Sequence, residues 1–157
     1  MFTKNKLLII SALVLLPTLY FFVTYSNKSN ASINLSTTNN SVLKNGKQIY
    51  AENCASCHGV NLEGQKDWKS RLPNGMMPAP PHDATGHTWH HPDRYLFMVT
   101  KYGIEELIGE KYPNNMPAYK DILNDEEIIA VLSYIKSTWP SEIIKIHDQI
   151  NSRANKN

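Results

Sequence analysis

The chain has 157 residues, two cysteines, and 16 lysines and arginines against 14 aspartates and glutamates. This length fits one domain with appendages. From Ser41 onward the positive and negative charges nearly cancel, and the basic residues are scattered. A nucleic-acid-binding protein usually has a clustered basic patch. We therefore expect no nucleic-acid partner.

Residues 1–25 are predicted to be a membrane anchor. The stretch Leu7–Tyr25 carries no charge, and as a helix it would span roughly 28 Å, close to the ~30 Å hydrocarbon core of a bilayer. A secretory signal has a shorter apolar region of about 7–15 residues, but Ser29-Asn30-Ala31 has a small-x-small cleavage pattern, so a cleaved signal peptide is the alternative. Lys4 and Lys6 precede the apolar stretch and place the remaining chain on the periplasmic side.

Residues 26–40 are rich in Ser, Asn and Thr without any period, which predicts a flexible linker. Residues 41–140 are the predicted main domain, and residues 141–157 a C-terminal helical extension. No stretch has a convincing strand pattern, so the predicted fold class is all-α.

Four helices are expected in the exported part. In the first, Val42 to Cys54, apolar or small residues recur every three or four positions, at Leu43, Gly46 and Tyr50. Glycine lowers helix stability relative to alanine. Its presence at position 46 therefore indicates the close approach of another element.

The other three helices have clear boundary signals. Pro92 and Gly103 bracket the second. The third begins with a capping box at Asn124 and Glu127 and ends before Trp139-Pro140. The last carries Ile143, Ile146, His147 and Ile150 on one face, and His147 is expected at the surface or half-buried.

The stretch Cys54-Ala55-Ser56-Cys57-His58 directly follows the first helix. Residues three apart face the same way on a helical turn, so both thiols can add to the two vinyl groups of one porphyrin. His58 can then take an axial position on the iron. A redox dithiol would need a βαβ context and a structural zinc site four Cys or His ligands, and the sequence offers neither. The motif predicts one covalent haem c attached to Cys54 and Cys57, with His58 as an axial ligand.

Long loops separate the helices, at residues 59–88 and 111–119. Loops of this length in a small domain indicate that something else completes the core, and a buried haem would do so. Met116 stands in the second loop just before Pro117, which disfavours helical backbone, and it is far enough from His58 in sequence to return on the other face of the haem. Met116 is the predicted second axial ligand, and Met77 is its main rival.

The segment from Met76 to His91 is unusually rich in methionine and histidine. The favoured interpretation is a loop that covers the haem. The alternative is a copper site, because thioethers and imidazoles can bind copper, with His87, His90 and His91 as the candidate ligands.

Four features in this order resemble the class I cytochrome c family: the helix with Gly46 and Tyr50, the motif CASCHG, the loop NNMPAY and the helix LNDEEIIAVLSYIKSTW. The resemblance covers Val42 to about Trp139. It implies a helical domain wrapped around one haem that is bonded to Cys54 and Cys57.

The resemblance also implies residue roles. His58 would be the proximal ligand and Met116 the distal one. Gly46 and Tyr50 would lie where the first helix crosses the helix that carries Tyr134. One proline among Pro78, Pro80 and Pro81 would accept a hydrogen bond from His58.

Iron with His and Met ligands has a raised reduction potential and no vacant position for oxygen. We therefore expect a single-electron carrier rather than an enzyme: a membrane-tethered or periplasmic monohaem cytochrome c that exchanges electrons with redox partner proteins in a respiratory-type chain. The alternatives are a haem subunit of a larger redox enzyme, or a ligand-binding or copper-handling haem protein.

Overall fold

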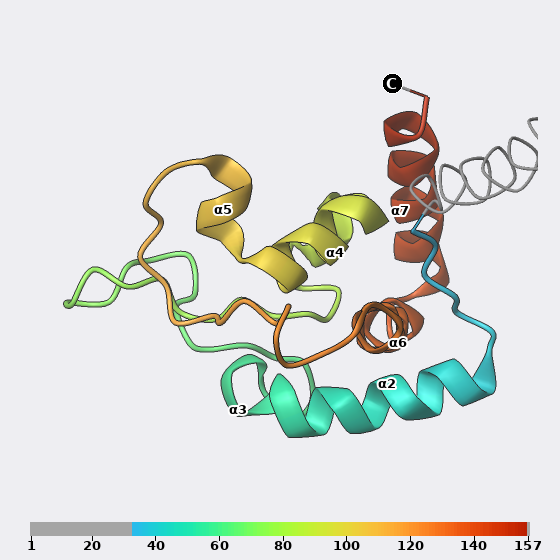
Figure 1. Ribbon diagram of the computed structural model, residues 1–157, viewed down its shortest axis with the longest axis horizontal. Coiled ribbons are helices and arrows are strands. Elements are labelled where there is room, and N and C mark those ends of the chain that lie inside the picture. Colours follow the sequence, from blue (N-terminus) through green and yellow to red (C-terminus); the bar gives the residue numbers. More distant parts are fainter. Residues whose placement is uncertain (1–32, 157) are drawn as a thin grey trace, which may run out of the picture. The chain divides into compact units, whose positions relative to one another are not determined.

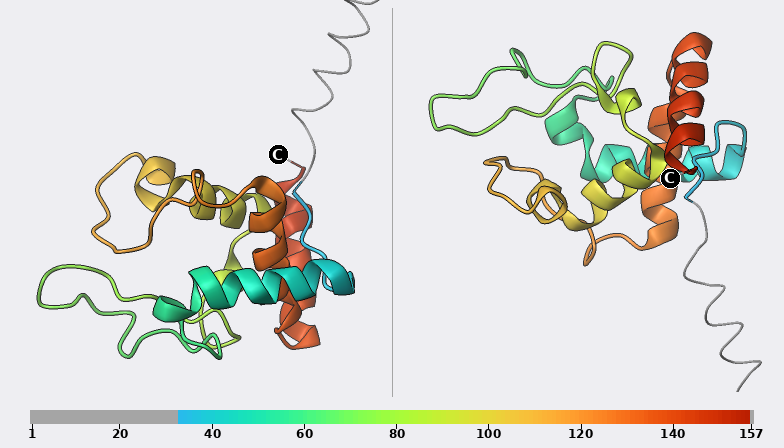
Figure 2. Two further views of the ribbon diagram at one scale, coloured as in Figure 1. Left: turned by 60° about the horizontal axis from the view of Figure 1, so that its bottom comes forward. Right: turned by 90° about the horizontal axis from the view of Figure 1, so that it is seen from above.

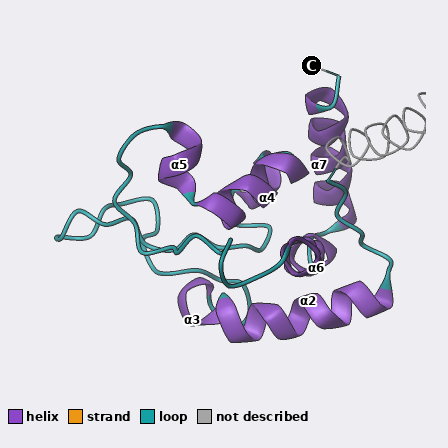
Figure 3. Ribbon diagram, in the orientation of Figure 1, coloured by secondary structure: helices purple, strands orange, loops and turns teal. Residues whose placement is uncertain are grey.

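The computed structural model describes residues 33–156. Figure 3 shows helices joined by long loops, and no strand is present among the described residues. The prediction of an all-α domain is confirmed for this part of the chain. Its elements are α2 (Asn40–Asn53), α3 (Ala55–His58), the 3-10 turn η1 (Thr88–His90), α4 (Asp93–Tyr102), α5 (Ile104–Ile108), α6 (Asp125–Ser137) and α7 (Ser141–Ala154).

Between residues 33 and 156, no helix combines the length and the apolar character needed to cross a membrane. The predicted anchor at Leu7–Tyr25 and most of the predicted linker lie outside the described residues.

The end of the predicted linker, from Ile33 to Asn39, packs on the domain. Leu35 is only 3% exposed, and its backbone N–H donates to Asp93 Oδ2 at 3.1 Å. Asn39 caps α2 by accepting from the backbone N–H of Val42 at 3.3 Å. The folded domain therefore begins before residue 41, and α2 starts at Asn40 because an N-cap asparagine satisfies its first free N–H groups.

The closest helix packing in the domain is the crossing of α2 and α6, which Figure 1 shows with α6 nearly end-on above α2. At Gly46 the α2 backbone meets the carbonyl group of Ala130, leaving no room for a side chain. One turn further, the rings of Tyr50 and Tyr134 lie 5.7 Å apart between centroids. The expected crossing at Gly46, Tyr50 and Tyr134 is confirmed.

The predicted ends of α4 and the predicted start of α6 agree with the structure. Asn124 and Glu127 form the predicted capping box, each side chain accepting from the other residue's backbone N–H. Helix α4 begins after Pro92 and ends at Gly103. The five-residue helix α5 was not predicted, because it is too short to show a helical period.

Helix α7 is anchored by a buried polar cluster, and this corrects the expectation for His147. That side chain is fully buried rather than near the surface. Its Nε2 lies 3.0 Å from the carbonyl oxygen of His91 and 3.4 Å from Asp93 Oδ1. Lys136 completes the cluster, 2.7 Å from Asp148 and 4.0 Å from Asp93. The sequence could not predict this burial, because the partners of His147, namely His91 and Asp93, lie on other elements.

The hydrogen bonds around His147 fit its neutral form. The backbone N–H of Asp93 donates to Asn151 Oδ1 at 2.6 Å, which turns the Asn151 amide nitrogen towards His147 Nδ1, 3.4 Å away. Nδ1 therefore accepts and Nε2 carries the proton. Burial and the neighbouring Lys136 lower the pKa of His147, against the opposing effect of Asp93.

The loops extend on the side of the domain opposite α7. Figure 2 shows the 59–87 loop and the 109–124 loop on that side in both of its views. The helices thus form a scaffold at one end, and the two loops face each other at the other end.

We predict that Gly46→Ala destabilises the protein by about 1–3 kcal/mol, because the new methyl group overlaps the Ala130 backbone. Alanine's better helix propensity is worth only about 1 kcal/mol and does not compensate. Urea unfolding of the haem-loaded protein measures the change. Asn45→Ala, at an exposed site in the same helix, is the matched control and should leave stability unchanged or slightly raised. Equal behaviour of the two variants would refute the close crossing.

We also predict that the stability supplied by neutral His147 is lost as the pH falls. The native pKa is below the ordinary value of about 6.5, so the unfolded chain binds more protons as the pH drops through that value, and this favours unfolding. The difference in unfolding free energy between pH 7.5 and pH 5.5 should be smaller in His147→Gln than in the wild type, by about 1 kcal/mol. An unaltered pH dependence in His147→Gln would contradict the neutral, buried assignment.

Candidate haem site

The cysteine motif occupies one helical turn at the end of α2. Cys54 is the N-cap of α3, and its carbonyl oxygen accepts from the backbone N–H groups of Cys57 at 3.1 Å and His58 at 2.9 Å. Residues three apart on a helical turn face the same way, so the two cysteines lie on one turn with the spacing that haem attachment needs. Cys57 is exposed and Cys54 half-buried. Burial and the nearby Cys57 raise the pKa of the Cys54 thiol to about 11.

Two tyrosine hydroxyls fix this turn at its ends. Tyr50 donates to the carbonyl oxygen of Gly59 at 2.8 Å. Tyr119 donates to the carbonyl oxygen of Asn53 at 2.7 Å. Burial raises the pKa of Tyr119 to about 12, so its hydroxyl keeps its proton and remains a donor at neutral pH.

His58 is buried, and its Nδ1 lies 2.8 Å from the carbonyl oxygen of Pro80. A carbonyl can only accept, so Nδ1 carries the proton, and Nε2 is the nitrogen that can coordinate iron. Burial lowers the pKa of His58, with the Pro80 contact acting in the opposite direction. A neutral imidazole oriented by a backbone carbonyl is the usual state of a metal-binding histidine. Of the three candidate prolines, Pro80 is the one whose carbonyl oxygen accepts the hydrogen bond from His58.

The segment Met76–His82, which we call the strap, joins several parts of the site. Ala79 is tied to Gln65 by two hydrogen bonds of 2.9 Å. The backbone N–H of Met77 donates to Pro113 at 3.0 Å, beside an isolated bridge between Met77 and Asn114. The strap therefore runs from the loop that carries Met116 to the ring of His58.

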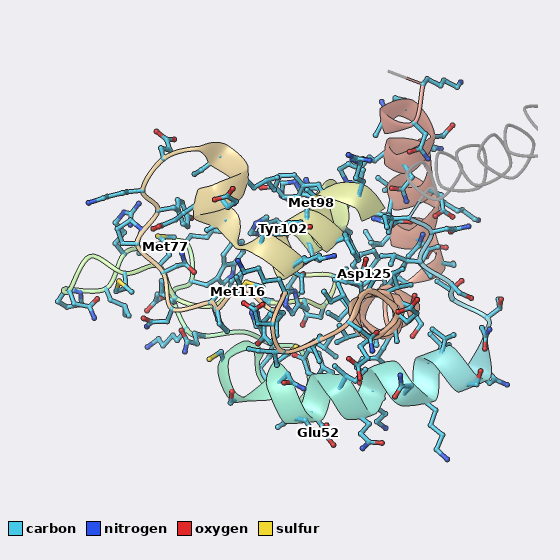
Figure 4. All side chains as sticks on the ribbon, viewed as in Figure 1. Glu52, Met77, Met98, Tyr102, Met116 and Asp125 are labelled. Carbon is cyan, nitrogen blue, oxygen red and sulfur yellow. The ribbon has the colours of Figure 1, made fainter. Side chains whose placement is uncertain are left out.

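Met116 lies in the second loop, where its side chain is 37% exposed. Its backbone N–H donates to Asn114 Oδ1 at 2.8 Å. Just after it, the backbone N–H of Tyr119 donates to Thr100 at 3.0 Å, which fixes the loop to α4. Figure 4 shows Met116 projected between the α4 residues Met98 and Tyr102 and the α3 turn, with Met77 farther out on the strap.

The loop side leaves several apolar side chains partly exposed. A pocket of about 310 Å³ opens at α4 and α5, lined by Met98, Tyr102, Glu106 and Leu107. Leu72, Ile108 and Met116 are each exposed by more than a third. A histidine with Nε2 available, two thiols on one turn and uncovered apolar loops together fit a large planar apolar group with a metal at its centre.

Each of the three candidate copper ligands lies against an aromatic ring. His87 stacks on Trp68 and His91 on Tyr95, with centroids 5.1 and 4.4 Å apart. The ring of His90 lies tilted against Trp89, with centroids 3.7 Å apart. In the part of the chain that the structure describes, no three His, Cys, Asp or Glu side chains converge as a metal site would require.

Comparison with known proteins agrees with this geometry. The cytochrome c family model matches residues 43–139, more than half of the chain. The chain belongs to the cytochrome c family. Its cofactor is therefore covalent haem c, and its function is haem-based electron transfer.

Three cytochrome relatives illustrate the match. Cytochrome c-552 of Thermus thermophilus is 35% identical over 97 residues, which cover 60% of this chain and 67% of that protein. Cytochrome c-555 of Prosthecochloris aestuarii is 34% identical over 75 residues, 44% of this chain and 76% of that protein. The Cbb3-type cytochrome c oxidase subunit CcoP of Azospirillum brasilense is 30% identical over 104 residues, 66% of this chain but only 31% of that protein. No solved structure matches significantly.

Two contacts at the site were not anticipated. Tyr119 is the last residue of the NNMPAY motif, and nothing in the sequence marks its hydroxyl as the donor to Asn53. His82, which stacks on His58 with ring centroids 3.9 Å apart, was considered only as part of the Met- and His-rich segment.

We predict that Tyr119→Phe destabilises the haem-loaded protein by about 1–2 kcal/mol, because the carbonyl oxygen of Asn53 loses its donor. Urea unfolding followed by far-UV circular dichroism measures the loss. Tyr102→Phe, at an exposed tyrosine on α4, is the control and should change stability by less than about 0.5 kcal/mol. Equal values for the two variants would show that the Tyr119 hydroxyl does not hold the cysteine turn.

Proposed function

We propose that this protein is a single-electron carrier: a monohaem cytochrome c, bonded to haem through Cys54 and Cys57, whose iron is ligated by His58 and Met116. The observation that carries the proposal is the hydrogen bond between His58 Nδ1 and the Pro80 carbonyl. It leaves Nε2 of a buried, neutral imidazole on the same turn as the two cysteines, as an axial ligand requires.

Backbone anchoring favours Met116 over Met77 as the second ligand. Met77 is fixed through its backbone N–H to Pro113, on the strap. Tyr119, three residues after Met116, donates to the carbonyl oxygen of Asn53, directly before the cysteine turn. Figure 4 likewise shows Met116 between α4 and this turn, with Met77 farther out, which supports Met116 as the second ligand.

Bound haem c would supply a one-electron couple at iron. The protein's own groups would then have three roles. The Pro80 carbonyl would orient His58 and raise its basicity. The Met116 thioether would be the second ligand, leaving no position for oxygen or peroxide. The apolar side chains of the loops would exclude water around the group.

A ligand-specific absorption band tests this assignment. We expect the oxidised protein to show the far-red charge-transfer band of a sulfur–iron bond. The band should disappear in Met116→Ala, because no second thioether takes its place, and should persist in the matched control Met77→Ala. Absorption spectra of the three oxidised proteins measure it.

The same spectra can contradict the assignment. Loss of the band in Met77→Ala with retention in Met116→Ala would exchange the two methionines. A high-spin wild-type protein that binds azide or carbon monoxide without competition would be inconsistent with an electron carrier that has both positions filled.

We further propose that the carrier works on the periplasmic face of the cytoplasmic membrane, tethered by Leu7–Tyr25 or released there after cleavage, in a respiratory-type chain. The charge pattern around Leu7–Tyr25 supports this orientation. The match to an oxidase subunit supports a second candidate, a haem subunit of a larger oxidoreductase. Blue-native electrophoresis of detergent-solubilised membranes with haem staining separates them: a single small haem band supports the free carrier, and a stable large complex supports the subunit.

A further inference from the structure

A second imidazole lies against the face of the candidate proximal ligand. The rings of His58 and His82 are stacked, with centroids 3.9 Å apart and planes 22° from parallel. This is face-to-face contact, whereas the Pro80 carbonyl contacts His58 only at one edge, through Nδ1.

The His82 ring is itself held in place. Its Nδ1 lies 2.8 Å from Thr88 Oγ1. Thr88 is buried, and its hydroxyl lies 3.5 Å from the carbonyl oxygen of Pro81, to which it can donate. Thr88 can therefore donate to Pro81 while it accepts from His82, which fixes the ring at Nδ1.

The backbone of His82 is fixed from both sides. Its N–H donates to the carbonyl oxygen of Leu62 at 2.8 Å, and its own carbonyl accepts from the indole N–H of Trp139 at 2.8 Å. Leu62 is buried with a φ of 65°, a conformation that non-glycine residues rarely adopt. Such a conformation persists only where surrounding contacts determine it, so this part of the fold is tightly constrained.

These contacts have a specific consequence for His58. The second side-chain torsion of a histidine has broad preferences, and a single hydrogen bond at Nδ1 leaves the ring some freedom to rock. A fixed ring 3.9 Å from its face removes much of that freedom. The orientation of the imidazole plane about the iron–nitrogen axis would then be set by the position of the second ring.

We propose that His82 is a positioning residue for electron transfer: its ring packs on His58 and fixes the plane of the proximal imidazole relative to the haem. This inference rests on the proposed role of His58 as a ligand. His82 itself contacts neither substrate nor iron in this account and acts through His58.

The test uses the haem-loaded protein in its oxidised state. The hyperfine-shifted NMR signals of the four haem methyl groups depend on the orientation of the axial ligand planes, so their order and spread report the plane of His58. His82→Leu should change this pattern, because a flexible aliphatic side chain replaces a fixed ring. His82→Phe, which keeps a flat ring but loses the bond to Thr88, should show a clearly smaller change than His82→Leu. Replacement of the exposed His90 by Leu is the matched control and should change nothing.

Each outcome decides the proposal. A wild-type methyl pattern in haem-loaded His82→Leu overturns it, and so does an equally large change in His82→Phe, because the flat ring would then not be what matters. If His82→Leu does not retain haem, Thr88→Val decides instead: it removes the hydroxyl that fixes His82, so a smaller change of the pattern supports the proposal and an unchanged pattern refutes it.

The readout also separates this inference from the proposed function. A merely structural role for His82 would lower the urea midpoint without moving the methyl pattern. Failure of the axial assignments would appear in the wild type itself: absence of the far-red band for Met116, and a proton on Nε2 for His58. A wild type with the band and an insensitive methyl pattern would remove only the role of His82.

Discussion

The hydrogen bond between His58 and the Pro80 carbonyl connects the helical scaffold to the loops. His58 ends the turn that follows α2, and α2 is positioned by its crossing with α6 at Gly46. Pro80 lies in the strap, which is tied through Met77 to the loop before Met116. Because the scaffold and the strap meet at this contact, the orientation of the candidate ligand depends on both.

The two ends of the domain are stabilised differently. At the helical end, α2, α4, α6 and α7 bury a continuous core, and Lys136, Asp93 and His147 form a polar cluster inside it. At the loop end, backbone hydrogen bonds connect the segments, while apolar side chains such as Leu72 and Ile108 stay exposed. Apolar surface of this kind is stabilised when it is removed from water. Haem is thus expected to contribute to folding as well as to electron transfer.

Much of the scaffold could be predicted because its determinants are local. The capping box at Asn124 marks a helix start through contacts only three residues apart, and Gly46 indicates a close crossing because glycine is otherwise costly in a helix. The cysteine motif is also local, because Cys54, Cys57 and His58 lie on one helical turn. The family match over residues 43–139 agrees with these local signals.

The remaining features depend on contacts between distant segments. Nothing in the sequence distinguishes Pro80 from Pro78 or Pro81 as the acceptor, because the choice depends on how the strap folds back on α3. The burial of His147 follows from its contacts with His91 and Asp93, on other elements. Leu35 sits in a polar stretch that is typical of a linker, but it is buried beside Asp93. In each case the deciding partner is more than twenty residues away.

The most direct test of the central contact is the protonation state of His58 in the haem-loaded protein labelled with nitrogen-15 at histidine. NMR should show a proton on Nδ1 of His58 that exchanges slowly with water, and no proton on Nε2. That result is expected if Nδ1 donates to Pro80 and Nε2 coordinates the iron. A proton on Nε2, or a rapidly exchanging proton on Nδ1, would contradict this account.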